Sequence, residues 1–117
     1  MTRTIVIVDD HPDFRRRARQ LLEAEGFEVV GDAADSSGAL SAAGELDPEL
    51  MLLDVNLPDG TGFEVCDRLN GLPGAPKVIL TSTRDEPEYA RLARRCGARG
   101  FVTKSELSGA AIERLLA

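Results

Sequence analysis

The chain has 117 residues, a length that suits one domain and leaves no room for a second. Its net charge of −6 argues against direct nucleic-acid binding by this chain alone, because neutralising phosphates requires Lys and Arg. No apolar run approaches the roughly 20 residues that span a bilayer, and the N-terminus lacks the organisation of a signal peptide. We therefore expect one cytoplasmic domain over residues 1–117, with no membrane segment.

Strand and helix patterns alternate along the first half of the chain. Residues 4–8 are apolar and mostly β-branched, which predicts a buried parallel strand. A helix is expected next, capped by Asp10 and ended by Gly26. Residues 27–30 are predicted to form a short second strand, and residues 36–44 carry a weak helical pattern.

The second half of the chain continues this alternation. We expect strands at residues 50–53, 77–81 and 100–103. Helices are expected at residues 63–69, 87–97 and 107–116, and the turn-rich segment 56–62 is interpreted as a loop. Five strands in strict alternation with five helices predict an α/β fold, in which helices cover both faces of a parallel sheet.

Four of the predicted strands end on chemically reactive side chains. These residues are, in chain order, Asp9, Asp10, Asp54, Thr81, Ser82 and Lys104. A parallel sheet brings the carboxyl ends of its strands together at one edge, and ligands of open α/β sheets bind there. The sequence therefore predicts that carboxylates, a hydroxyl and an amine from distant parts of the chain meet in one site.

These residue types are the ones that phosphoryl transfer to a carboxylate needs. Asp9 and Asp10 are adjacent like charges, and a magnesium ion, which prefers oxygen ligands, would relieve their repulsion. Asp54 could attack phosphorus and form an aspartyl phosphate if a metal and the cation of Lys104 offset the charge. Each residue also has an ordinary interpretation, as a helix-capping or solvated aspartate, a surface lysine or, for Ser82, a turn hydroxyl.

The reactive strand ends resemble the signature of the response-regulator receiver domain of two-component signalling. The matching residues are Asp9, Asp10, Asp54, Ser82 and Lys104, and the resemblance covers the whole chain. Residues 7–15 and 30–35 are similar to receivers of the LuxR-type, NarL-like subfamily, which usually precede a helix-turn-helix. The resemblance implies a flavodoxin-like (βα)5 fold, a three-layer sandwich whose five-stranded parallel sheet has the order 2-1-3-4-5.

The resemblance also implies a phosphorylation site with a magnesium ion beside it. Asp54 would be the phosphoacceptor and would receive its phosphoryl group from a sensor histidine kinase or a phosphotransfer protein. Asp10 would bind Mg²⁺ directly and Asp9 through water, while Asp54 and the main-chain carbonyl of Asn56 would complete the ligands. Lys104 would pair with the phosphoryl group. The chain would catalyse only its own phosphorylation and dephosphorylation, so it is not expected to be an enzyme.

The resemblance also assigns residues to the conformational switch and to the lifetime of the phosphoaspartate. Ser82 would be the switch hydroxyl, favoured over Thr81 because its spacing from the site lysine fits the family better. Phe101 falls where the family has an aromatic rotamer switch, commonly Tyr, and its ring would act by packing alone. Asn56 and Arg84 occupy the positions that tune how fast the phosphoaspartate hydrolyses.

The signal is expected to leave the domain through protein–protein binding. The readout face would consist of the fourth helix, the fifth strand and the fifth helix, and it could also form a phosphorylation-dependent homodimer. Arg91, Arg94, Arg95 and Arg99 make this region locally basic, a pattern that fits a solvated helix face as well as a partner-binding patch. The sequence does not identify the output protein or domain.

Three alternative interpretations stay open from the sequence. The chain could be the receiver fragment of a longer LuxR-type DNA-binding transcription factor. It could be a flavodoxin-like cofactor-binding protein, although the loop after the first strand is acidic and lacks a Gly-rich or Ser/Thr-rich phosphate loop. It could also be a degenerate receiver that binds partners without phosphorylation, although the complete site argues against this.

Three further residues with reactive side chains are given ordinary interpretations. His11 lies at a predicted helix start beside a proline, and it is interpreted as packed or solvated instead of metal-binding. Cys66 and Cys96 lack ligand-type spacing and lie in helical patterns, so both are expected to be reduced and partly buried.

Overall fold

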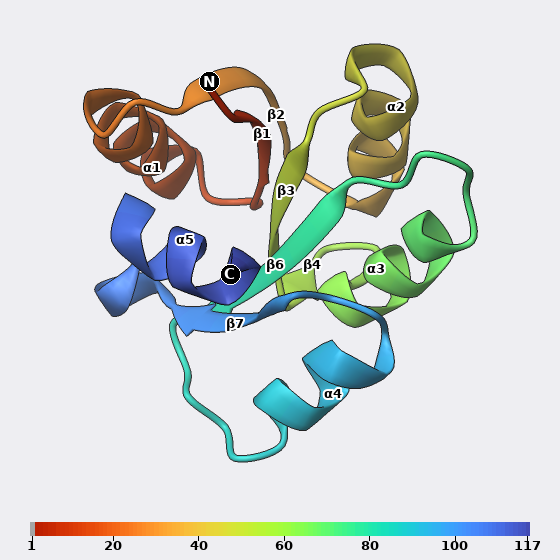
Figure 1. The fold of residues 1–117 in the computed structure, drawn as a ribbon. Coiled ribbons are helices and arrows are strands. Elements are labelled where there is room, and N and C mark those ends of the chain that lie inside the picture. Colours follow the sequence, from red (N-terminus) through yellow and green to blue (C-terminus); the bar gives the residue numbers. More distant parts are fainter. Residues whose placement is uncertain (1) are drawn as a thin grey trace.

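A computed structural model, which describes residues 2–117, confirms the predicted fold class (Figure 1). One sheet holds five parallel strands in the order β2-β1-β3-β6-β7. Counted among these five strands alone, this is the predicted order 2-1-3-4-5. The strands are β1 (Thr4–Val8), β2 (Glu28–Ala33), β3 (Leu50–Asp54), β6 (Lys77–Ser82) and β7 (Gly100–Thr103).

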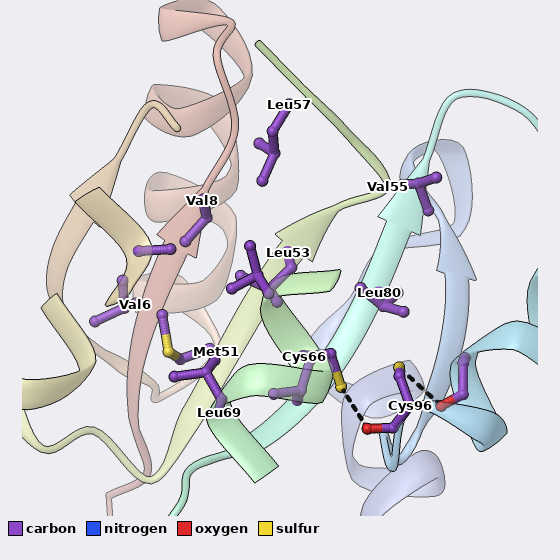
Figure 2. Close-up of a cluster of buried hydrophobic side chains, with 14 of the residues drawn as sticks. Val6, Val8, Met51, Leu53, Val55, Leu57, Cys66, Leu69, Leu80 and Cys96 are labelled. Atoms are coloured by element: carbon purple, nitrogen blue, oxygen red, sulfur yellow. Dashed lines mark hydrogen bonds between the residues drawn. The ribbon is translucent and has the colours of Figure 1, made fainter. Parts of the chain in front are cut away.

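Helices cover both faces of the sheet and complete three layers (Figure 1). They are α1 (Pro12–Ala24), α2 (Ser36–Leu46), α3 (Gly62–Asn70), α4 (Tyr89–Arg95) and α5 (Gly109–Leu116). Alternate residues of β1 pack into the two apolar layers, because successive side chains of a strand point to opposite faces. Ile5 and Ile7 join the cluster under α1 and α5. Val6 and Val8 join the cluster under α2, α3 and α4 (Figure 2).

Two details at the start of the predicted helices are wrong. His11, in an extended conformation, is the N-cap residue of α1, and no side chain makes a capping hydrogen bond there. Asp10 therefore does not cap this helix. The last helix begins at Gly109 instead of residue 107, because residues 104–106 form a 3-10 turn and the Ser108 hydroxyl accepts the Ala111 N–H at 3.0 Å.

Three other elements differ from their expected bounds by two residues or more. β2 continues to Ala33, because its last residue, Ala33, still pairs with Val8 at the end of β1. α2 continues to Leu46 and ends on Asp47, which adopts a left-handed conformation with φ of 44°. α4 begins at Tyr89, after the loop that contains Pro87.

The segment predicted as a loop contains a short antiparallel hairpin, β4 (Asn56–Leu57) and β5 (Gly60–Thr61). The turn residue Asp59 accepts hydrogen bonds from the backbone N–H groups of Ser36 (2.7 Å) and Ser37 (3.2 Å) at the start of α2. On the other side, Thr61 and Glu64 form a reciprocal capping box at the start of α3. The hairpin that follows Asp54 is therefore fixed to α2 at its turn and to α3 at its last residue.

Gly62 lets α3 begin directly behind the end of β3. A β-carbon at this position would lie 2.3 Å from the Asp54 carbonyl oxygen, which is closer than any real side chain approaches a backbone atom. The absence of a side chain thus allows the close packing that holds Asp54 at the sheet edge.

Both cysteines are reduced and buried in the layer that contains α3 (Figure 2). The Cys66 thiol donates to the Cys96 carbonyl at 3.3 Å, and the Cys96 thiol donates to the Ala93 carbonyl at 3.2 Å. Burial raises the pKa of the Cys66 thiol, so it behaves as a small apolar side chain. Among residues 2–117, no helix combines the length and apolar character that crossing a membrane requires.

Candidate functional site

The carboxyl edge of the sheet brings the predicted site residues together. Asp9 and Asp10 follow β1, Asp54 ends β3, Ser82 ends β6, and Lys104 follows β7. A cavity of about 220 Å³ opens at this edge, and its lining includes Asp10, Asp54, Asn56, Ser82 and Lys104. The parallel sheet therefore places these side chains at one edge, as expected, although Asp9 and Lys104 are 95 positions apart in the chain.

Lys104 links the two buried carboxylates of the site. Asp9 is 0% and Asp54 is 4% exposed. The Lys104 ammonium lies 2.5 Å from Asp9 Oδ2 and 3.5 Å from Asp54 Oδ2, and its side chain is only 11% exposed. It also lies 4.3 Å from the centre of the Phe14 ring, which places the cation against an aromatic face. The amine is thus a fixed buried charge and not a surface lysine.

The pKa values of the two buried aspartates are shifted in opposite directions. Burial, followed by the negative charge of Asp9, raises the pKa of Asp54 to about 6, and the charge of Lys104 only partly opposes this rise. Burial also disfavours ionisation of Asp9. The ammonium of Lys104 and hydrogen bonds from His11 outweigh it, however, and hold the pKa of the Asp9 carboxyl below its ordinary value. The site therefore contains one firmly ionised carboxylate and one that is electrostatically strained.

A group of side chains at this edge has the composition of a divalent-cation site. One ligand atom each from Asp9, Asp10, His11 and Asp54 lies within 4.8 Å of all the others. Three carboxylates suit a hard cation such as Mg²⁺. Asn56 lies next to them and donates its backbone N–H to Asp54 Oδ1 at 3.4 Å.

His11 is the member of this group that the sequence interpretation set aside. Its Nδ1 atom lies 2.9 Å from Asp9 Oδ1 and 3.1 Å from Asp10 Oδ1, while the ring is 65% exposed. The one signal in the sequence was its position directly after two aspartates at a strand end. That signal is weak without the structure, because a helix-start histidine can turn in any direction.

The two hydroxyls at the end of β6 lie in different surroundings. Thr81 and Ser82 are both buried. Ser82 lines the same cavity as Asp54 and Lys104, and its oxygen accepts the Arg84 N–H at 3.1 Å. The Thr81 hydroxyl is among the buried polar groups of residues 2–117 that lack a hydrogen-bond partner. The structure therefore places Ser82, and not Thr81, at the cavity.

Phe101 belongs to a row of aromatic rings that joins three elements. Its ring meets that of Tyr89 edge-on at 5.3 Å, and Tyr89 in turn lies 5.8 Å from Phe63. These rings come from β7, α4 and α3. The position of Phe101 is thus coupled through packing to the start of α4.

The Arg84 side chain is 75% exposed and does not line the cavity. Its guanidinium is 3.9 Å from the Glu86 carboxylate, at the outer range of an ion pair. The segment around it leads from Ser82 to α4, so its backbone connects the cavity to that helix.

Comparison with known proteins identifies the family. Residues 5–115 match the model of the response regulator receiver domain. The chain belongs to this family. As a receiver, it is 42% identical over 109 residues to the transcription regulator of virulence factors BvgA from Bordetella pertussis. It is also 34% identical over 102 residues to the nitrate/nitrite response regulator NarL from Escherichia coli.

The receiver matches only part of these relatives. The aligned regions cover 91% of this chain but 51% of BvgA, and 86% of this chain but 47% of NarL. The chain thus spans about half the length of the relatives that it matches. Among solved structures, the LuxR-family two-component response regulator from Aurantimonas sp. SI85-9A1 has a TM-score of 0.89 at 31% identity. The match covers 99% of this chain and 86% of that one.

The receiver also carries the basic surface that the sequence indicated. The side chains of Arg91, Arg94, Arg95 and Arg99 are all exposed, on α4 and on the connection from α4 to β7. A second cavity, of about 730 Å³, borders the site on the α1 side and includes Phe14, Leu21 and Leu107. Sequence reasoning did not find this cavity, because its walls come from separate segments that only the fold brings together.

Proposed function

We propose that this receiver accepts a phosphoryl group on Asp54 from a histidine kinase or a phosphotransfer protein and signals by a change of conformation. The observation that carries the proposal is the geometry around Asp54. A buried carboxylate with a raised pKa stands 3.5 Å from a fixed ammonium group and beside two further carboxylates. Such a group is a nucleophile with charge compensation built around it.

The covalent step transfers the phosphoryl group from nitrogen to oxygen. An Asp54 carboxylate oxygen attacks the phosphorus of a phosphohistidine and forms a P–O bond. The P–N bond breaks, its electron pair stays on the imidazole nitrogen, and that nitrogen then takes up a proton. The product is an acyl phosphate on Asp54, which water later hydrolyses to carboxylate and inorganic phosphate. Asn56 and Arg84, at the edge of the cavity and beyond it, are proposed to tune that hydrolysis.

The donor set of the site fits Mg²⁺, which supplies positive charge to the transferring phosphoryl group when bound. Asp10 and Asp54 are proposed to bind the metal directly, Asp9 through water, and the main-chain carbonyl of Asn56 is proposed to complete the protein ligands. Lys104 pairs with the phosphoryl group once it is present. The short contact between Lys104 and Asp9 Oδ2 supports this arrangement, because it keeps the ammonium beside Asp54.

Ser82 is proposed to convert the new charge into movement. A phosphoryl group adds about −1.5 to −2 charges and strong acceptor oxygens. The Ser82 hydroxyl donates to one of them, and Phe101 turns into the space that is left. A charge-assisted hydrogen bond of about 1.5–3 kcal/mol shifts a two-state equilibrium by roughly tenfold to 150-fold. A nearly complete shift of the conformational equilibrium needs about 5.5 kcal/mol. Contacts of the phosphoryl group with Lys104 and the metal contribute the remaining free energy.

The altered surface is proposed to lie on α4, β7 and α5, where it binds an output protein or output domain or forms a homodimer. The exposed arginines of α4 support an acidic partner surface. BvgA and NarL are named as regulators, and this favours transcription control through a DNA-binding output domain as the biological outcome. The receiver itself, with a net charge of −6, is not proposed to contact DNA.

Incubation with Mg²⁺ and acetyl phosphate tests the central proposal. We expect intact-mass spectrometry to show a single phosphoryl addition that is lost on brief alkaline treatment, as acyl phosphates are. Chelation of the metal before the donor is added should prevent the addition. Addition at full rate without a divalent cation, or an alkali-stable product, would contradict the proposed chemistry.

Ser82→Ala is expected to leave phosphorylation intact and to reduce the conformational response. The chain has one tyrosine and no tryptophan, so tyrosine fluorescence reports on Tyr89 alone, 5.3 Å from Phe101. Phosphorylation should change this emission in the wild type and change it much less in the variant. Thr81→Ala is the matched control, because its hydroxyl is equally buried but lies outside the cavity lining. A full response in Ser82→Ala would remove Ser82 from the switch.

A further inference from the structure

The imidazole of His11 stands where the acidic site opens to solvent. The cavity of about 220 Å³ at the sheet edge includes His11 in its lining, together with Asp10 and Asp54. Its Nδ1 atom faces the carboxylates, since the contacts of the ring with Asp9 and with Asp10 both involve that nitrogen. The ring is thus partly exposed, while one of its nitrogens points into the site.

The distances around Nδ1 match a metal coordination shell. Two adjacent ligands of an octahedral ion with bonds of about 2.1 Å lie about 3.0 Å apart. His11 Nδ1 lies 2.9 Å from Asp9 Oδ1 and 3.1 Å from Asp10 Oδ1. His11 Nδ1 and Asp10 Oδ1 can therefore occupy adjacent positions around one ion, with the cation replacing the proton that Nδ1 shares with Asp9 Oδ1.

The two oxygens of Asp9 have separate partners. Oδ2 contacts the Lys104 ammonium, whereas Oδ1 faces His11 and accepts its backbone N–H at 2.8 Å. A cation bound between Oδ1 and Nδ1 therefore need not displace Lys104 from Asp9. Asp54 completes the group, because its ligand atom lies within 4.8 Å of the other three.

An imidazole changes which cations the site prefers. Carboxylates, carbonyls and water suit Mg²⁺, whereas imidazole suits d-block ions such as Ni²⁺ and Zn²⁺. We infer that His11 is an additional metal ligand at the acidic site and that its nitrogen raises the affinity of the site for d-block divalent cations relative to Mg²⁺. This inference rests on the metal site of the proposed function.

The test compares Ni²⁺ and Mg²⁺ binding by isothermal titration calorimetry near neutral pH. Ni²⁺ is the probe because the only imidazole in the chain is that of His11 and both cysteines are buried. In His11→Gln the ratio of Ni²⁺ to Mg²⁺ affinity should fall by at least about tenfold. Arg17→Gln, an exposed change on α1, is the matched control and should leave the ratio unchanged.

Two further readouts locate the ion. The single histidine gives one set of ring proton signals, and stoichiometric Ni²⁺ should broaden them in the unphosphorylated protein. Excess Mg²⁺ should restore these signals if both ions share the site. An unchanged affinity ratio in His11→Gln, or Ni²⁺ binding that Mg²⁺ does not displace, would overturn the inference. Failure of the wild type to bind Mg²⁺ would overturn the proposed metal site as well, so the two failures are distinguishable.

Discussion

Lys104→Met is expected to destabilise the receiver by about 3–5 kcal/mol at neutral pH, because breaking a buried ion pair leaves an uncompensated charge. The ammonium is the fixed positive charge between Asp9, which is 0% exposed, and Asp54. Methionine keeps the length and the apolar stem of the side chain, so the loss reports on charge and not on packing. Urea unfolding followed by far-ultraviolet circular dichroism measures the effect.

Lys77→Met is the matched control for this prediction. The Lys77 side chain is 40% exposed and its ammonium lies 3.8 Å from the Glu49 carboxylate, so the ion pair should contribute no more than about 1 kcal/mol. Mg²⁺ should also restore more stability to Lys104→Met than it adds to the wild type, since the ion supplies the missing positive charge. Similar small losses in both variants would show that the Lys104 contacts do not hold the carboxylates together.

Asp54→Asn is expected to have the opposite effect on stability. The rise of the Asp54 pKa from its ordinary 3.8 to about 6 corresponds to about 2–3 kcal/mol of unfavourable charge burial at neutral pH. Asparagine has the shape of the neutral acid without its charge, so the variant should be more stable than the wild type by that amount. The same variant should take up no phosphoryl group from acetyl phosphate, which separates its stability from its proposed function.

The stabilisation of Asp54→Asn should depend on pH. Unfolded wild-type chain loses the Asp54 proton near pH 3.8, whereas the folded protein retains it up to about pH 6. Wild-type stability from this group therefore falls as the pH rises through that range, and the advantage of the variant should be absent well below pH 4 and nearly complete above pH 6.

An aspartate whose pKa moves the other way provides the control. Hydrogen bonds from Ser36 hold the pKa of the exposed Asp59 carboxyl below its ordinary value, so Asp59→Asn should lose stability at neutral pH. That loss should disappear as the pH falls below the ordinary range of an aspartate. An Asp54→Asn variant that is less stable than the wild type at neutral pH would contradict the electrostatic strain that we assign to Asp54.

The sheet and the position of the site follow from local patterns in the sequence. Fully apolar, β-branched strands such as Ile5–Val8 can lie only between two helical layers, and a parallel sheet then places every strand end at one edge. For this reason the sequence alone predicts that Asp54 and Lys104 lie close together. The chemical capability of each side chain is also predictable from the sequence, because carboxylates, amines and hydroxyls keep their functional groups in any fold.

What the sequence could not predict depends on contacts between segments. The start of α5 was misplaced because the helical pattern does not show that the chain first makes a 3-10 turn after Lys104. The hairpin after Asp54 was read as a loop, since its two strands hold only two residues each. The direction of the His11 ring is set by two distances to carboxylates, and no spacing in the sequence contains that information.

The anchoring of the β4–β5 hairpin has a consequence for where a signal can travel. On that side of Asp54, the Asp59 carboxylate and the capping box of Thr61 tie the backbone to two helices. On the other side, one hydrogen bond among residues 2–117 holds the segment from Ser82 to α4 at the cavity. The Arg84 N–H donates it to the Ser82 hydroxyl. Local opening costs less free energy where fewer bonds must break. Asp54 thus lies between a firmly anchored hairpin and a segment that opens at lower cost, so we expect a displacement at the cavity to be transmitted toward α4.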